Sequence, residues 1–488
     1  MSNLTVVSAP GKVLLTGGYL ILDRKYNGIV VGTSARFYTV IFSGNNGKIS
    51  VHSPQFIDGE WEYRPSLKSF YNDEGFFSCE LESTNPERHN SFVEIAIKYS
   101  LLIISRRKNE QQFKEIVTKG LEIYIVGDND FYSQREQLRK LNLPLTLSSL
   151  KSLEPFCKVH CTLKKVNKTG LGSSAALITS LVSALFVHFE IVSNKINEIT
   201  NNDRKLIHNI AQFCHCLAQG KVGSGFDVSA AVWGSHIYKR FSPNILENVM
   251  DQNVDISILN NIVDPASSKW DNQVTSFSLP HGFKLILADI DAGSHTPSMV
   301  GKVLKWRKEN SDQANTLWDT LTSHNTTVSN NLRELTKNHE QDEELYLNAI
   351  KICESVKASE WALLAEQNPN NNNVTLFSST FNTFQKIREL LREMSELSRV
   401  PIEPPKQTKL LDACNEIPGI IMAGVPGAGG YDAIFCIGLG NTFSSQIEKL
   451  WNSWEEMSVG PLLSRESSKG YMIEQINNIP GLSECLNL

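Results

Sequence analysis

Residues 168–187 join a glycine- and serine-rich turn to a long apolar run, and no other segment constrains the fold as strongly. The turn holds two glycines and two adjacent serines, and apolar side chains then recur at helical spacing at positions 178, 181, 182 and 185. A helix that opens from such a turn presents free backbone N–H groups and the positive end of its dipole. Phosphate suits this geometry, and the hydroxyls can bind the phosphate or its magnesium ion.

Three interpretations of this turn compete. Gly170, Gly172 and Ala175 fit the spacing of a dinucleotide fingerprint, but the apolar run leaves no room for the strand and acid which that motif requires. The second interpretation is a loop that binds a nucleoside triphosphate. It would differ from the known Walker and protein-kinase loops, because the chain lacks both signatures. The third is a turn that only caps a core helix, although two adjacent serines exceed what a cap needs.

Length, charge and cysteine usage narrow the class of protein. The 488 residues predict two domains, each able to bury a full core. A net charge of -5 argues against a nucleic-acid or anionic-membrane binder. The N-terminus lacks signal-peptide features and no apolar run approaches membrane-spanning length, so we expect a cytoplasmic protein. Its nine cysteines lack C-x-x-C spacing and are expected to be free thiols, and nothing implies an obligate protein partner.

Hydrophobic patterns place strands and helices along the whole chain and favour α/β or α+β layering. Residues 44–90 are expected to form hairpins and loops, and residues 127–156 a loop excursion. A polar, proline-containing stretch near 240–280 suggests a domain connection, dividing the chain into residues 1–275 and 276–488. The clearest strands are expected at 36–42, 121–126 and 283–290, and the clearest helices at 92–104, 177–187, 203–219 and 375–398.

Two charged residues far from the turn are candidates for chemistry. Lys12 lies in a Pro-Gly-Lys-Val segment that is expected to turn into an apolar strand. It is either a surface lysine or a fixed cation near a reacting hydroxyl or phosphate. Asp227 follows a glycine-rich stretch at an expected helix start. It either caps that helix or orients and deprotonates an acceptor group.

Two further segments offer backbone or hydroxyl groups to a ligand. Four glycines between 424 and 430 allow close approach of backbone to a ligand, although a hairpin turn is the simpler interpretation. Ser294, His295 and Thr296 precede an expected helix and would hold a phosphate or carboxylate. Alternatively they cap that helix, with Pro297 at its first position.

Three of these motifs, in this order, resemble those of the GHMP small-molecule kinase superfamily. They are Pro-Gly-Lys-Val with Gly-Gly-Tyr at 10–19, Gly-Leu-Gly-Ser-Ser-Ala-Ala at 170–176, and Gly-Ala-Gly-Gly-Tyr-Asp at 427–432. Details around 168–169, 221–227, 294–301 and 424–432 are similar to the phosphomevalonate kinases of that superfamily in particular. The resemblance spans about residues 6–466. It implies an α+β GHMP kinase fold: an N-terminal ribosomal-protein-like α/β domain with a left-handed β-α-β unit, a C-terminal ferredoxin-like domain, and an active site between them.

The resemblance also implies roles for individual residues. Transfer of a phosphoryl group from ATP to 5-phosphomevalonate would use Lys12 and Asp227 as catalytic residues, with Mg²⁺ held by Ser173 or Ser174. The loop around the ATP phosphates would comprise Lys168, Thr169, Gly170, Leu171, Gly172, Ser173, Ser174, Ala175 and Ala176. Acceptor binding would involve Tyr19, Lys221, Ser224, Ser294, His295 and Thr296. The third glycine motif would contribute Gly427, Ala428, Gly429, Gly430 and Asp432.

The chain departs from the wider superfamily at three places. Gly18 stands where many members carry Glu, Lys168-Thr169 replaces a proline-containing lead, and Tyr431 interrupts a run of glycines. The first change leaves the magnesium ligand set incomplete. Mevalonate kinase, or another kinase of the superfamily, is the main alternative, and a non-catalytic ligand sensor of the same fold is the second.

Overall fold

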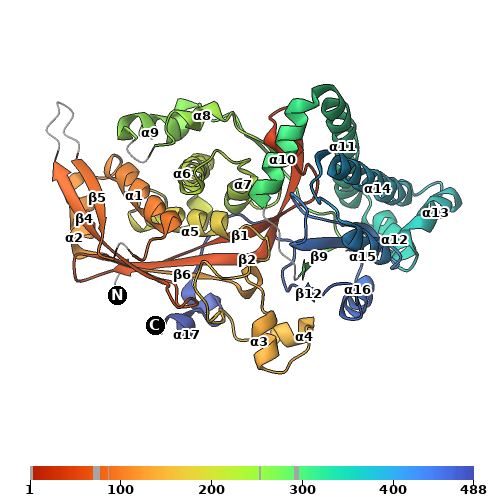
Figure 1. Ribbon diagram of the computed structural model, residues 1–488, viewed down its shortest axis with the longest axis horizontal. Helices are drawn as coiled ribbons and strands as arrows, with labels where there is room; N and C mark the ends of the chain where they lie inside the picture. The colour runs from red at the N-terminus through yellow and green to blue at the C-terminus, as the bar shows by residue number, and fades with distance from the viewer. Residues whose placement is uncertain (1–3, 70–76, 86, 252–253, 291–295, 488) are drawn as a thin grey trace.

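The computed structural model describes residues 4–69, 77–85, 87–251, 254–290 and 296–487. Two lobes, each built on one sheet, lie side by side along the long axis of the molecule (Figure 1). The described residues include no helix that is long and apolar enough to cross a bilayer.

The first lobe is a sheet with the order β13-β1-β2-β6-β3-β4-β5, to which β7 adds at β2 and β8 at β7. Its pairings are antiparallel except that of β3 with β6, which the chain reaches through β4, β5 and two helices. The strands are β1 (Thr5–Leu14), β2 (Asn27–Ser43), β3 (Ile49–His52), β4 (Glu60–Ser69), β5 (Phe77–Ser83), β6 (Leu121–Gly127), β7 (His236–Lys239), β8 (Gln273–Ser276) and β13 (Met472–Ile473).

Strand β2 shows how this sheet is covered on both faces. Phe37 and Ile41 pack into the main core, whereas Tyr38 and Val40 pack into a separate cluster on the opposite face. Side chains of a strand alternate between faces, so an almost continuous apolar run predicts burial on both. Helices α1, α5, α6 and α7 lie on one face and α17 (Leu482–Leu486) on the other (Figure 1).

Helix α5 (Ser173–His188) is the central element of this lobe. It packs on β1 and β2 and is flanked by α1 (Ser91–Ser105), α6 (Asn201–Gln219) and α7 (Phe226–Trp233). Ile178, Leu181, Val182 and Leu185 are fully buried, as their helical spacing predicted. Because neighbours surround α5 on all sides, the N-terminal turn is held rigidly by the core of the lobe.

The second lobe contains a sheet with the order β10-β11-β9-β12, in which every pairing is antiparallel. Along the chain, β9 is followed by helices α10 to α15, then by β10 and β11, then by α16 and finally by β12. This is the β-α-β-β-α-β connectivity of a ferredoxin-like sheet. The strands are β9 (Phe283–Ile290), β10 (Ile420–Gly424), β11 (Ala433–Leu439) and β12 (Val459–Pro461). The helices are α10 (Thr296–Glu309), α11 (Ser311–Gln341), α12 (Glu343–Cys353), α13 (Trp361–Gln367), α14 (Asn372–Ser398), α15 (Pro405–Asn415) and α16 (Phe443–Asn452).

The end of the chain returns to the first lobe. Met472 and Ile473 pair with β1, and Gly470 accepts a hydrogen bond from the buried Arg36 guanidinium. The division of the chain at residue 275 therefore stays a prediction. The last segment, although it follows the second lobe in the chain, adds strand β13 to the sheet of the first lobe.

Two segments contain more regular structure than their sequences indicated. The expected loop excursion at 127–156 includes the short helices α3 (Arg135–Lys140) and α4 (Leu147–Lys151), each anchored by one buried leucine, Leu138 and Leu150. The expected connection near 240–280 contains α8 (Asn244–Glu247), α9 (Ile256–Val263) and the edge strand β8. Elements this short carry too few periods for a pattern to be detected.

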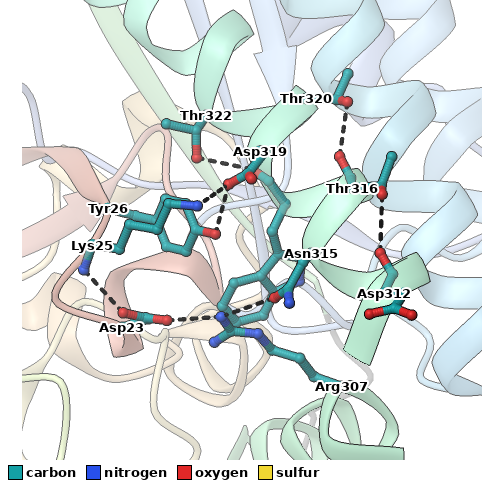
Figure 2. Close-up of polar contacts among 11 residues, drawn as sticks. Asp23, Lys25, Tyr26, Arg307, Asp312, Asn315, Thr316, Asp319, Thr320 and Thr322 are labelled. Atoms are coloured by element: carbon teal, nitrogen blue, oxygen red, sulfur yellow. Dashed lines mark hydrogen bonds and ion pairs between the residues drawn. The ribbon is translucent and has the colours of Figure 1, made fainter. Parts of the chain in front are cut away.

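Side chains from residues 23–26 of the first lobe contact α10 and α11 of the second (Figure 2). Arg307 forms an ion pair with Asp23 at 2.7 Å, and its guanidinium lies 3.9 Å from the ring centre of Trp318. Tyr26 donates a hydrogen bond to Asp319 at 2.9 Å. These contacts fix α10, whose Val300 lines the cavity between the lobes.

Candidate active site

Lys12 reaches the cavity because β1 is irregular at this point. The segment expected to be a sharp turn lies inside β1, where a β-bulge between Pro10 and Lys12 shifts the register against β2. Gly11 is required there, since a Cβ atom would lie 2.8 Å from the Leu171 carbonyl. The bulge re-aims the strand so that the Lys12 side chain meets the glycine–serine loop.

Lys12 is bound to that loop at two atoms. Its backbone N–H donates to the Leu171 carbonyl at 2.9 Å, and its Nζ donates to the Gly170 carbonyl at 2.8 Å. Gly172 adopts a φ of 79°, and a Cβ atom there would lie 3.1 Å from the lysine stem. The first and second motifs therefore form one structural unit, in which glycine is needed both for the backbone and for the close approach.

The loop opens α5, with Gly172 as its N-cap residue. The hydroxyl of Thr169 donates to the Asp130 carbonyl, so it anchors the loop to the lobe. Ser173 and Ser174 form the first turn of α5, whose N–H groups have no partner within the helix. This end of the helix is a ready binding site for anionic oxygens.

Asp227 is the second residue of α7, as its glycine-rich lead predicted. Gly225 occupies the N-cap position, and the Asp227 Oδ1 atom accepts from the N–H of Val228 at 3.0 Å. The other oxygen, Oδ2, lies 3.8 Å from Nε2 of His215 on α6. The Ser174 hydroxyl lies 3.1 Å from that same ring nitrogen.

The third glycine motif forms the opposite wall, between β10 and β11. Gly427 has a φ of 65° and no atom within 4 Å of a Cβ position, so the side of this residue that a side chain would occupy is open. The Tyr19 hydroxyl donates to the Ala428 carbonyl at 2.7 Å and so joins the two lobes. Gly430 instead supports the loop by donating to the Ile402 carbonyl.

These elements enclose a cavity of about 480 Å³ between the two lobes. Most of the residues predicted from the sequence line it. They are Lys12, Tyr19, Lys168, Thr169, Gly170, Leu171, Gly172, Ser173, Ser174, Lys221, Ser224, Asp227, Gly427, Ala428, Gly429 and Asp432.

A few predicted residues lie elsewhere. Ala175 and Ala176 are buried against the main core, where they hold α5 in place. Thr296 is the first residue of α10. Ser294 and His295 lie outside the described residues.

Burial and charge act against each other at Lys12. Burial lowers the pKa of its ammonium group, whereas the nearby carboxylates of Asp227 and Asp432 raise it. Burial is the larger effect, so the pKa lies below the ordinary lysine value. Burial also lowers the pKa of His215, so its ring is neutral at neutral pH.

The sequence did not identify His215, whose Nε2 atom lies near both Ser174 and Asp227. No cluster of three or more His, Cys, Asp or Glu side chains suited to a metal occurs in the part of the chain that the structure describes. A usable signal exists in α6, where His208, Gln212, His215 and Gln219 follow the i, i+4, i+7, i+11 spacing of one helix face.

Part of each lobe matches a known family model. The model for the N-terminal domain of GHMP kinases matches residues 144–235, and the model for their C-terminal domain matches residues 375–455.

Full-length relatives are also found among curated proteins. The peroxisomal phosphomevalonate kinase of Arabidopsis thaliana is 38% identical, with 96% of this chain and 96% of its own length covered. A phosphomevalonate kinase of Aspergillus fumigatus is 36% identical, with 93% and 91% covered.

A solved structure shares the fold. Phosphomevalonate kinase of Streptococcus pneumoniae, in complex with phosphomevalonate and AMPPNP, superimposes with a TM-score of 0.58 over 95% of this chain and 99% of its own. Its sequence identity is 13%, so this likeness bears on the fold alone.

Proposed function

This chain belongs to the phosphomevalonate kinase family, and from that premise we propose that Lys12, Asp227 and the loop at 168–176 perform its phosphoryl transfer. The chain is a phosphotransferase that moves the γ-phosphoryl group of ATP to 5-phosphomevalonate, giving ADP and 5-diphosphomevalonate in the mevalonate route to isoprenoids and sterols. The observation that best supports the proposed site is the 2.8 Å hydrogen bond from the Lys12 Nζ to Gly170. It sets a cation at the edge of a helix N-terminus that is open to phosphate.

The loop at 168–176 is proposed to hold the ATP phosphates. Backbone N–H groups at the start of α5 bind anionic oxygens, and the α5 dipole adds partial positive charge there. Lys168, at the front of the loop and on the cavity wall, is a second lysine beside these donors, and burial lowers its pKa. Because α5 is packed on all sides, these donors need no reorganisation when ATP binds.

The oxygen donors near Ser174 fit a magnesium ion. Mg²⁺ prefers oxygen ligands and is usually bound by one or two carboxylates together with substrate phosphates. The Ser174 hydroxyl and the Asp227 carboxylate lie 3.1 and 3.8 Å from the same Nε2 atom of His215 in the cavity wall, and Ser173 precedes Ser174 in the chain. We propose that Ser174 and Asp227 hold the ion, which would neutralise charge on the ATP phosphates when bound.

The neutral ring of His215 would orient the Ser174 hydroxyl. A ring nitrogen that accepts the hydroxyl proton leaves the oxygen lone pairs of Ser174 directed away from the ring. His215 is thus a positioning residue for this ligand, and the Gln219 amide nitrogen, 3.1 Å from the same Nε2 atom, favours the tautomer in which Nε2 accepts.

Electrostatics dominates the proposed chemistry because both reactants are polyanions. The acceptor is a phosphate monoester with a second pKa of about 6, so at neutral pH it needs little deprotonation. Lys12 would offset repulsion between the two phosphates and stabilise charge in the transition state. The Asp227 carboxylate raises the pKa of Lys12 and so favours its charged form. We propose that supporting the charge of Lys12 is a larger part of the role of Asp227 than abstracting a proton from the acceptor.

Binding of the acceptor is proposed for the segment between α6 and α7. Lys221 and Ser224 lie in this segment, line the cavity and can receive the acceptor's existing phosphate. The Tyr19 hydroxyl is already bound to Ala428, so Tyr19 would contribute its ring and fix the third glycine loop.

Two acceptors compared side by side test the function. The purified protein is supplied with ATP and either 5-phosphomevalonate or mevalonate, and ADP release is measured. We expect turnover with 5-phosphomevalonate and little with mevalonate, because mevalonate has no phosphate for Lys221. The reverse preference would indicate a mevalonate kinase, and binding of ATP without turnover would indicate a ligand sensor.

We also propose that the protein acts in the cytoplasm. The free cysteines of the described residues suit a reducing compartment, whereas the Arabidopsis relative is named as peroxisomal. Fluorescence of the tagged full-length chain in cells of its source would test this, and accumulation in peroxisomes would contradict it.

A further inference from the structure

A second cavity, larger than the one between the lobes, lies at the far end of α6 and α7. Its volume is about 720 Å³, which is within the range of small-molecule sites. Lys205 and His208 come from the N-terminal half of α6, Trp233 ends α7, and Lys269 and Trp270 come from the loop after α9. None of the residues that line this cavity lines the candidate active site.

The rings in this cavity form a preassembled aromatic surface. The His208 ring centre lies 4.6 Å from that of Trp233 and 5.2 Å from that of Trp270. The Trp270 N–H donates to the Ile262 carbonyl at 3.0 Å, which fixes its indole ring. Two half-buried indoles and a buried imidazole suit a flat ring in the ligand.

The charge of the cavity is positive. Lys205 and Lys269 are exposed at its wall, and neither forms an ion pair within the described part of the chain. Asp264 is the carboxylate among the lining residues, and it is engaged by Arg107 at 3.6 Å and by the Ala266 N–H at 2.9 Å. Two uncompensated ammonium groups beside rings favour an anionic ligand.

A hydrogen-bonded path connects this cavity to the candidate active site. Gln212, one turn along α6 from His208, lies 3.3 Å from the His208 Nε2 atom and donates to the Gly225 carbonyl at 2.5 Å. Burial lowers the pKa of His208 to about 3, so the ring is neutral and Nε2 can accept. Gly225 is the N-cap residue of α7, two residues before Asp227.

Helix α7 itself is the second connection. It begins beside Asp227 in one cavity and ends with Trp233 in the other, about 9 Å further along its axis. A short helix that is packed against α5 and α6 moves as a rigid body. A ligand that shifts Trp233 would therefore move Asp227 as well.

We propose that this cavity binds a small anion carrying a flat ring, and that its occupancy alters phosphoryl transfer through Gln212 and α7. The binding step is independent of the proposed function, whereas the effect on turnover rests on it.

Phenyl phosphate is a suitable probe, because it has one flat ring and one phosphate. Binding is followed by quenching of tryptophan fluorescence, with the active site saturated by AMPPNP, and Trp233→Phe assigns the signal. We expect saturable quenching in the wild type, with inorganic phosphate and cyclohexyl phosphate each binding at least 10-fold more weakly. The Lys205→Gln/Lys269→Gln variant should bind at least 10-fold more weakly. Lys114→Gln/Lys195→Gln should bind normally, since each of these lysines already pairs with a glutamate.

Turnover is measured with 5-phosphomevalonate, with and without saturating phenyl phosphate. We expect kcat or KM to change at least twofold in the wild type, and not in the Lys205→Gln/Lys269→Gln variant. Gln212→Met or Gln212→Leu should retain quenching but lose the change in turnover, and either variant suffices if the other fails to fold. Absent quenching, equal binding by both lysine variants, or binding with unchanged turnover would overturn the proposal. A wild type inactive without the probe would instead contradict the proposed function and leave the binding result intact.

Discussion

Replacing Lys12 with methionine tests the central electrostatic claim. Methionine keeps an apolar stem to pack against Gly172 and Phe226 but removes the ammonium group, whose Nζ lies 5.5 Å from the Phe226 ring centre. A unit charge roughly 5 Å from a phosphoryl oxygen contributes about 3 kcal/mol at an effective dielectric constant of about 20. Since about 1.4 kcal/mol corresponds to one decade in rate, kcat/KM should fall by ~10²-fold or somewhat more.

The assay is ADP release at saturating ATP with varied 5-phosphomevalonate. Because Lys12 would act most strongly on charge in the transition state, kcat should fall more than KM rises. Lys48→Met is the matched control. That lysine belongs to the same lobe, pairs with Glu62 at 2.8 Å and does not line the cavity, so its loss should leave kcat unchanged. A Lys12→Met enzyme within threefold of wild type, with intact folding, would refute the proposed role.

Three further predictions concern charge, metal and stability. Asp432→Asn removes a carboxylate that raises the Lys12 pKa, so the alkaline loss of kcat should move to lower pH, and an unchanged or higher midpoint would contradict this. Ser174→Ala should raise the Mg²⁺ concentration for half-maximal rate by about 10-fold or more, measured by titration at fixed ATP. Arg388 is 2% exposed and pairs with Glu403, which is 0% exposed and also pairs with Arg392. Arg388→Met should therefore destabilise the chain, but by less than the roughly 3–5 kcal/mol expected for a buried carboxylate left with no partner. Urea unfolding would measure that loss, and Arg388→Met/Glu403→Leu should recover part of it because the fully buried carboxylate is removed as well.

The sequence predicted those parts of the site that need special residue types. Glycines at 170 and 172 have positive φ angles, and the one at 172 leaves space for the Lys12 stem, so their positions in the chain carry the geometry directly. Long helices with many periods are also predicted well. The ends predicted for α14 lie within three residues of the observed ends, and the prediction for α5 begins at the first residue of its apolar run. The sequence predicts a turn where the structure has the bulge at Lys12, because a proline and a glycine favour both and only pairing with β2 distinguishes them.

Helix α6 shows why the rest could not be predicted. Its apolar positions identify a buried helix, and polar residues among them are usually satisfied core side chains. The shared helix face of these polar residues indicates a function only when the structure shows what they contact. His208 lines one cavity and His215 lines the other. Gln212 lies between them and its side-chain nitrogen serves both the His208 ring and the Gly225 carbonyl. A polar stripe inside a buried helix costs free energy, and the Oε1 atom of Gln212 has no hydrogen-bond partner among the described residues, so the stripe is better explained by its contacts at the two cavities than by packing of the core. The same stripe that positions Ser174 through His215 thus supplies the physical route by which a ligand at Trp233 would reach Asp227.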